Sequence, residues 1–213
     1  MILAITEIVS SVQGEGKFTG FPTTFVRLAG CNLKCSFCDT AYANKGRKKR
    51  MSIQTILNYI FKMGNQYICI TGGEPLLQEE VYTLIYELVD RGYNVTIETN
   101  GAVEIEDYGY LRSFSYCMDI KCPSSGMDSH NKYSNLANLI AKDEVKFVVK
   151  DLEDYTFAKE VIRKYPTKAS FIFSPVMNRD GTSSAKNLAE WITVDKIPKA
   201  KLGVQVHKLI GVY

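Results

Sequence analysis

Short apolar runs alternate with amphipathic stretches along most of this chain, and this order constrains the fold more than any other feature. Runs rich in β-branched and aromatic residues are typical of strands, whereas apolar residues three or four positions apart are typical of helices. Strands are predicted at 24–28, 67–71, 94–98, 116–120, 144–149, 169–173 and 202–206. Helices are predicted between several of them, over about 53–61 with Ser52 as the cap, 81–91, 158–165 and 185–192. Parallel strands need crossover connections of this kind, so the order predicts right-handed βαβ units.

The number of these units predicts an open sheet rather than a closed barrel. An eight-fold β/α barrel takes roughly 250 residues, whereas this chain has 213. We expect an α/β fold, a partial (open) parallel β/α barrel of about six strands. The length and the even composition predict one domain over residues 1–213. Chemistry in such folds lies at the carboxyl ends of the strands, which here are followed by residues 30–31, 72–75, 99–100 and 121–123.

The composition excludes several classes of protein. The chain is 46% hydrophobic and 23% charged, which is ordinary for a globular protein and excludes a disordered one. A formal net charge of +3 is too small to predict nucleic-acid binding. No apolar run approaches the roughly 18 residues that a membrane span needs, and the N-terminus lacks the basic segment of a secretory signal. We therefore predict a cytoplasmic protein with neither a nucleic acid nor a membrane as its partner.

Three of the six cysteines, Cys31, Cys35 and Cys38, lie close together directly after a predicted strand. Three neighbouring thiolates repel one another and need a cation to hold them. A structural zinc site has four ligands, and no fourth Cys or His lies nearby. Three cysteines suit a [4Fe-4S] cluster that keeps one iron open for another ligand. A zinc site and three metal-free thiols are the alternatives.

The cysteine spacing, with Phe37 before the third cysteine, resembles the signature of the radical S-adenosylmethionine (SAM) superfamily. Thr71-Gly-Gly-Glu-Pro75 follows a predicted strand and resembles the superfamily's glycine-rich segment, which binds the methionyl amino group. Glycines allow the backbone to come close to a ligand. The resemblance implies two cofactors, a [4Fe-4S] cluster and SAM, and a flavodoxin- or ferredoxin-type reductant.

Further segments resemble the 7-carboxy-7-deazaguanine synthase family over almost the whole chain. Gln13-Gly-Glu-Gly16 and Cys38-Asp-Thr40 are the most specific, and the others are 25–28, 76–78, 98–101, 119–126 and 205–208. The resemblance implies a radical SAM lyase of queuosine biosynthesis. Such an enzyme converts 6-carboxy-5,6,7,8-tetrahydropterin to 7-carboxy-7-deazaguanine with release of ammonia. It also implies Mg²⁺ on the substrate, and a homodimer.

The resemblance assigns roles to individual residues. The metal ligands are Cys31, Cys35 and Cys38 for the cluster and Thr40 for Mg²⁺. The residues that contact SAM are Phe37, Cys38, Asp39, Gly72, Gly73, Glu74, Asp119, Ile120 and Lys121. The residues that contact the substrate are Val12, Gln13, Gly14, Arg27, Thr71 and Tyr213. The catalytic candidates are Glu15, Arg27 and His207.

The residue types suit these roles. Gln and Glu side chains match the donors and the carbonyl on the amino-pyrimidinone edge of a pterin or deazaguanine. The planar fork of Arg27 suits a carboxylate, with a surface ion pair as the alternative. The Thr40 hydroxyl is a hard oxygen donor for Mg²⁺, with a helix or turn cap as the alternative. His207 is either a core histidine or an acid–base group of the pocket.

Three other functions remain alternatives. Queuine lyase, a salvage enzyme, resembles the synthase in sequence and releases a 7-aminomethyl-7-deazaguanine. The chain end, residues 209–213, departs from the aromatic ending of many synthases, which leaves this alternative open. A glycyl-radical activating enzyme is the second alternative, but it would leave the Gln-Gly-Glu-Gly segment unexplained. A zinc-stabilised RNA-binding module is the third, but the chain has no fourth zinc ligand near the three cysteines. The basic run 45–50 is predicted to be a solvated loop.

Overall fold

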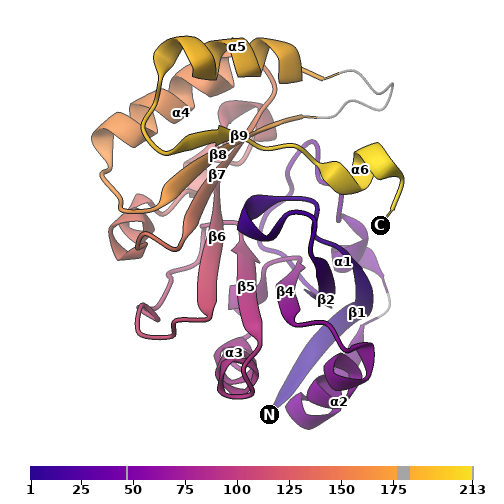
Figure 1. The fold of residues 1–213 in the computed structure, drawn as a ribbon. Helices are drawn as coiled ribbons and strands as arrows, with labels where there is room; N and C mark the ends of the chain where they lie inside the picture. Colours follow the sequence, from indigo (N-terminus) through magenta and orange to yellow (C-terminus); the bar gives the residue numbers. More distant parts are fainter. Residues whose placement is uncertain (47, 177–182, 213) are drawn as a thin grey trace.

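The computed structural model describes residues 1–46, 48–176 and 183–212 (Figure 1). Nine strands of this part form one sheet in the order β3-β1-β2-β4-β5-β6-β7-β8-β9. The strands are β1 (Ile2–Val12), β2 (Pro22–Leu28), β3 (Lys49–Ser52), β4 (Tyr67–Gly72), β5 (Asn94–Thr99), β6 (Phe114–Ile120), β7 (Glu144–Val149), β8 (Ser170–Pro175) and β9 (Ala200–Leu202). The α-helices are α1 (Tyr42–Lys45), α2 (Ile53–Met63), α3 (Val81–Asp90), α4 (Leu152–Lys164), α5 (Ala185–Asp195) and α6 (Val206–Ile210). None of the described helices is long and apolar enough to cross a bilayer.

The parallel part of the sheet confirms the predicted open β/α barrel. Strands β2, β4, β5, β6, β7, β8 and β9 run parallel to one another. The sheet has more strands than the six or so predicted, because β1 and β3 extend it on the antiparallel side. The basic run 45–50 is correspondingly not all loop, since Lys49 and Arg50 begin β3. Charged side chains suit this position at the end of the strand order, where they oppose pairing with another sheet.

The predicted strand at 202–206 is wrong in its boundaries. Strand β9 ends at Leu202, and the N–H of Gly203 donates to the carbonyl of Phe173 at 2.7 Å. The chain then turns, and the N–H of Val206, the first residue of α6, donates to the carbonyl of Gly14 at 3.1 Å. This non-local contact places α6 beside the hairpin loop between β1 and β2 (Figure 1). No local sequence pattern reports such a contact.

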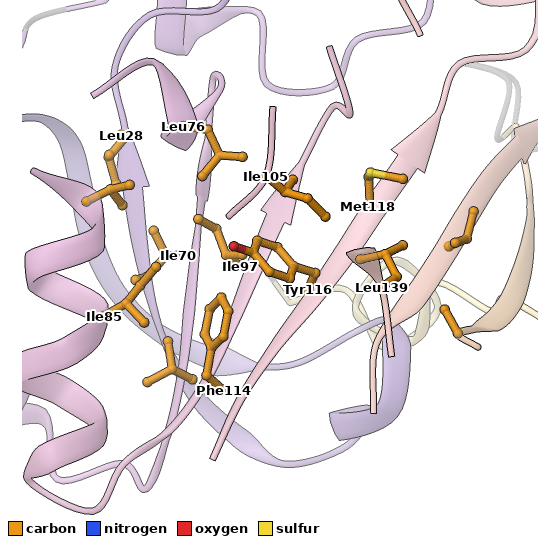
Figure 2. Packing of buried hydrophobic residues seen from close by; sticks show 14 of the residues in the cluster. Leu28, Ile70, Leu76, Ile85, Ile97, Ile105, Phe114, Tyr116, Met118 and Leu139 are labelled. Atoms are coloured by element: carbon orange, nitrogen blue, oxygen red, sulfur yellow. The ribbon is translucent and has the colours of Figure 1, made fainter. Parts of the chain in front are cut away.

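One face of the parallel strands is apolar and packs under the helices. Alternate residues along a strand point to opposite faces, and Ile70 and Ile97 lie on this face with Ile85 of α3 close by (Figure 2). The predicted cap of α2 is confirmed, because the Ser52 hydroxyl accepts a hydrogen bond from the N–H of Thr55 at 3.1 Å. Each fully buried aliphatic side chain stabilises the fold by about 1.5–3 kcal/mol, so this layer holds the sheet in place.

The other face of the same strands carries polar and charged side chains. They alternate with the core residues and include Thr71 in β4, Glu98 in β5, Asp119 in β6 and Lys146 in β7. Buried polar groups are normally hydrogen-bonded or paired with an opposite charge. We call this polar side of the open barrel the concave face. Burying polar groups there costs more free energy than burying apolar ones, which makes it the place to look for a functional site.

Candidate active site

Four loops meet at the carboxyl ends of adjacent strands. The strand register pairs Leu28 of β2 with Gly72 of β4, and Thr99 of β5 with Met118 of β6. Since β4 and β5 are also neighbours, the segments that follow β2, β4, β5 and β6 lie along one edge of the sheet. The predicted cluster segment, glycine-rich segment and Asp119–Lys121 segment are therefore brought together, as the parallel fold requires.

The three predicted cluster ligands lie in the irregular loop between β2 and α1. All three are free thiols; Cys31 and Cys35 are half-buried and Cys38 is exposed. Burial raises the pKa of the Cys35 and Cys38 thiols, and the charge of the neighbouring sulfurs raises it further. The sulfur of Cys31 accepts hydrogen bonds from the N–H of Leu33 at 3.5 Å and the amide of Asn100 at 3.6 Å.

These thiols have the donor chemistry of an iron–sulfur site. Mutually repelling sulfurs on one loop, with N–H donors directed at one of them, suit a cationic iron cluster. Within the described ranges, no three His, Cys, Asp or Glu side chains are already arranged as a metal-binding group. The fit therefore rests on the residue types and their shared loop, and the cluster itself would set the final positions of the sulfurs.

The glycine pair after β4 lets two loops come unusually close. A Cβ atom on Gly73 would lie 1.9 Å from the carbonyl oxygen of Gly30, and one on Gly72 would lie 2.3 Å from that of Leu28. The N–H of Gly73 donates to Leu28 and the N–H of Glu74 donates to Gly30, at 3.0 and 2.7 Å. The glycine-rich segment is thus attached to the start of the cysteine loop, where a cosubstrate shared by both would sit.

The Glu74 carboxylate is fully buried and already occupied. Its Oε1 accepts from the N–H of Leu76 at 3.0 Å and the hydroxyl of Thr99 at 2.8 Å, while Oε2 accepts from the N–H of Asn100 at 2.6 Å. Burial raises the pKa of Glu74, although these hydrogen bonds act in the opposite direction. The Glu74 side chain therefore holds the end of β5 in place. The predicted contact between Glu74 and SAM would have to be made by its main chain.

A chain of alternating charges lies on the concave face. Lys121 is 2.6 Å from Asp119, and Lys146 is 3.4 Å from Asp119 and 3.2 Å from Glu15. Desolvation would raise the pKa of Asp119, but the two lysines outweigh it and hold that pKa below its usual value. For Lys146, the carboxylates outweigh desolvation and raise the pKa well above the usual value. The side chain of Ile120 points away from this network and is buried in the core.

The loop between β1 and β2 carries the predicted substrate residues. Gln13 is buried and Val12 is half-buried. A Cβ atom on Gly14 would lie 1.7 Å from Nδ1 of His207, so a larger residue at this position would force the His207 side chain to move. The Glu15 carboxylate accepts a hydrogen bond from Gln205. Burial lowers the pKa of the half-buried His207.

Arg27 and Thr71 extend this site toward the cysteine loop. Arg27 Nε lies 3.0 Å from Glu7, but it makes no hydrogen bond within the described part of the chain although the atom is buried. The guanidinium therefore takes part in an ion pair, the alternative weighed above, and the side chain is 21% exposed, so part of it stays open to a ligand. The Thr71 hydroxyl donates to Glu98 at 2.8 Å.

Thr40 and Asp39 lie at the outer side of the cysteine loop. The Thr40 hydroxyl donates to the Asp39 carboxylate at 2.9 Å and does not cap α1. Desolvation would raise the pKa of Asp39, but this hydrogen bond and the charge of Lys208 outweigh it and lower the pKa. A hydroxyl next to an ionised carboxylate offers hard oxygen donors that suit Mg²⁺. Tyr213, the last predicted substrate residue, lies outside the described residues.

Several residues of the site were not given a role by the sequence. They are Glu98, Asn100, Lys146 and Gln205, each of which contacts a predicted site residue. The detectable signal for two of them was a charged residue beside buried apolar residues of a strand, Glu98 after Ile97 near the end of β5 and Lys146 between Val145 and Phe147 in β7. The other two lie in loops, where a polar residue by itself indicates nothing.

The fold and the cysteine loop define a radical SAM enzyme, and the sequence profile of the radical SAM superfamily matches residues 26–124. The chain is 42% identical over 213 residues to the 7-carboxy-7-deazaguanine synthase of Methanospirillum hungatei, covering 98% of this chain and 86% of the relative. It is 40% identical to the enzyme of that name from Koribacter versatilis, covering 98% and 96%. This chain belongs to the 7-carboxy-7-deazaguanine synthase family.

A solved structure confirms the fold independently. The crystal structure of QueE from Escherichia coli matches with a TM-score of 0.75 at 22% identity, covering 96% of this chain and 94% of that one. Membership of the family confirms the predicted enzyme class, a radical SAM lyase, and the predicted cofactors, a [4Fe-4S] cluster and SAM.

Proposed function

We propose that this chain converts 6-carboxy-5,6,7,8-tetrahydropterin to 7-carboxy-7-deazaguanine with release of ammonia. The observation that carries the proposal is the position of Arg27. It precedes the cysteine loop by four residues, lies beside Thr71 of β4 in the strand register, and has a side chain that is 21% exposed. A guanidinium in this place suits the carboxylate of the substrate. The names of the relatives support the same reaction.

The cofactors supply the difficult chemistry and the chain positions them. Cys31, Cys35 and Cys38 would hold the cluster, and the segments at 72–74 and 119–121 would hold SAM beside it. When bound, cluster and SAM together supply a 5′-deoxyadenosyl radical that removes hydrogen from a C–H bond of the substrate. What the chain must do is hold the correct C–H bond close to that radical and keep water and O₂ away.

The hairpin loop between β1 and β2 would read the amino-pyrimidinone edge of the substrate. Glu15 is held on both sides, by Lys146 at 3.2 Å and by Gln205, so its carboxylate is fixed in position. An ionised carboxylate accepts hydrogen bonds from ring and exocyclic N–H groups. A cavity of about 10 Å³ beneath the loop has room for about one water. This cavity is too small for a bicyclic substrate, so the substrate would bind outside it.

The decisive assay offers the protein both candidate substrates. Protein loaded with iron and sulfide is incubated anaerobically with SAM, dithionite and either the carboxypterin or queuine, and the products are identified by mass spectrometry. We expect 7-carboxy-7-deazaguanine from the carboxypterin. Cleavage of queuine without turnover of the carboxypterin would overturn the proposal and assign the chain as a queuine lyase.

A matched pair of variants tests the carrying observation. Arg27→Lys keeps the charge but removes the planar fork, so we expect the KM for the carboxypterin to rise at least tenfold, about 1.4 kcal/mol. Arg91→Lys alters an exposed ion pair with Glu87 and is the control. Equal KM values for the two variants would show that Arg27 does not bind the substrate.

The remaining partners belong to this proposal as well. Mg²⁺ would bind at Thr40, and a Thr40→Val variant should lose any Mg²⁺ dependence of turnover. A flavodoxin- or ferredoxin-type protein would reduce the cluster, and residues 1–213 would work as one radical SAM domain in the cytoplasm. A homodimer is proposed from the family resemblance, and β9, which ends the strand order, leaves an edge that a partner could cover; light scattering that finds a monomer at micromolar concentration would overturn it.

A further inference from the structure

We propose that Asn100 raises the reduction potential of the cluster by donating a hydrogen bond to Cys31. Asn100 directly follows β5, is 7% exposed, and has its side-chain nitrogen 3.6 Å from the Cys31 sulfur. The inference rests on the cluster site described above, and it does not depend on which substrate the enzyme turns over.

The orientation of the Asn100 amide is fixed by its neighbours. Its Oδ1 accepts from the N–H of Ala102 at 2.9 Å, and its Nδ2 donates to Oδ1 of Asn32 at 2.8 Å. An amide rotated by 180° would bring its NH₂ group against the N–H of Ala102, two donors facing each other. The NH₂ group must therefore face the cysteine loop, with one hydrogen for Asn32 and the other for the sulfur.

The backbone of Asn100 is fixed as firmly as its side chain. Its N–H donates to the buried carboxylate of Glu74 at 2.6 Å, and the hydroxyl of Thr99 donates to the same carboxylate. Glu74 is itself attached to the cysteine loop, since its N–H donates to the carbonyl of Gly30. The donor and the loop that carries the sulfur are thus two ends of one connected unit, so the fold keeps them close while the cluster sets the final position of the sulfur.

A donor on a ligand sulfur changes the electronic properties of the cluster. The reduced cluster carries one more negative charge than the oxidised one, and part of that charge resides on the sulfurs. An N–H directed at a sulfur stabilises the reduced form more than the oxidised form, which raises the reduction potential. Leu33 supplies a second donor from its main chain, which a substitution at Asn100 leaves in place.

The test is an anaerobic redox titration of the loaded protein without pterin, with the reduced cluster followed by electron paramagnetic resonance. Asn100→Asp keeps the acceptor for Ala102 and replaces the donor by a carboxylate oxygen, and Asn100→Ala removes both groups. We expect the midpoint potential to become more negative in both variants, and most in Asn100→Asp, with four irons retained per chain. Asn58→Asp adds the same charge on the exposed part of α2 and is the control, expected to leave the potential unchanged.

Two outcomes would overturn the inference. One is an unchanged midpoint potential in an iron-loaded Asn100→Ala variant. The other is a shift in Asn58→Asp equal to that in Asn100→Asp, which would assign the effect to net charge alone. If Asn100→Asp fails to retain iron, Asn100→Ala decides, because it introduces no charge. A failure of the reaction proposed above would appear as the wrong product, which this titration does not measure.

Discussion

Replacing Lys146 by Met removes a cation that contacts both the substrate loop and the proposed SAM segment. The Lys146 side chain is 13% exposed, and its ammonium group lies 3.2 Å from Glu15 and 3.4 Å from Asp119. Met has a similar length and no charge, so the substitution leaves two buried carboxylates with less compensation. We expect a marked loss of stability together with weaker substrate binding.

The magnitude follows from the partners that remain. Removing one member of a buried ion pair costs about 3–5 kcal/mol. Asp119 keeps Lys121 at 2.6 Å and Glu15 keeps Gln205, so we expect the lower end, about 3 kcal/mol. For a chain of this size that corresponds to a melting temperature about 6–12 °C lower.

The assay is urea unfolding of the cluster-free protein, followed by the fluorescence of Trp191 and by circular dichroism. Trp191 lies in α5 with its ring 5.4 Å from that of Tyr155. Lys132→Met is the control, because Lys132 pairs with Glu104 on the surface and is 46% exposed; such pairs contribute about 0.2–1 kcal/mol. Equal losses in the two variants would refute the reasoning, because the network on the concave face would then behave like any surface ion pair.

Three further variants test other parts of the account. Glu74→Gln places an NH₂ group next to N–H and O–H groups that now donate to the carboxylate. It should lower the free energy of unfolding, measured in urea, by about 1–3 kcal/mol. Gly73→Ala brings a Cβ atom into the Gly30 carbonyl and should lower the iron bound per chain; unchanged iron would contradict this close approach. Burial lowers the pKa of His207 below its usual value of 6.5. The unfolded chain therefore binds a proton at His207 more tightly than the folded chain does, and the stability falls as the pH drops below 6.5. His207→Gln should flatten the decline in stability between pH 7 and 5, and an identical slope would contradict the shift.

Local patterns predicted the parallel core of the fold. The strands β4, β5 and β7 were predictable because each is a short run of β-branched residues bounded by turn signals. Ser52 marks a helix start, and the structure confirms it through the side-chain cap on the N–H of Thr55. These features depend on neighbours within a few residues, which the sequence shows directly.

The rest depends on contacts that are distant in sequence. The sequence showed that Gln13-Gly-Glu-Gly16 was unusual, but it could not show that Val206 hydrogen-bonds to Gly14 or that Lys146 pairs with Glu15. The cysteine triplet and the glycine-rich segment were recognisable because they are contiguous. The groups that hold them, such as Asn100, act from other strands and became visible only in the folded chain.

The central proposal is that the concave face holds the carboxypterin so that the hydrogen removed is the one on C6, the ring carbon that carries the carboxylate. The most direct measurement uses substrate with deuterium at C6 and determines the mass of the 5′-deoxyadenosine formed. The account predicts that one deuterium is transferred into 5′-deoxyadenosine during formation of 7-carboxy-7-deazaguanine. Unlabelled 5′-deoxyadenosine formed together with that product would contradict it.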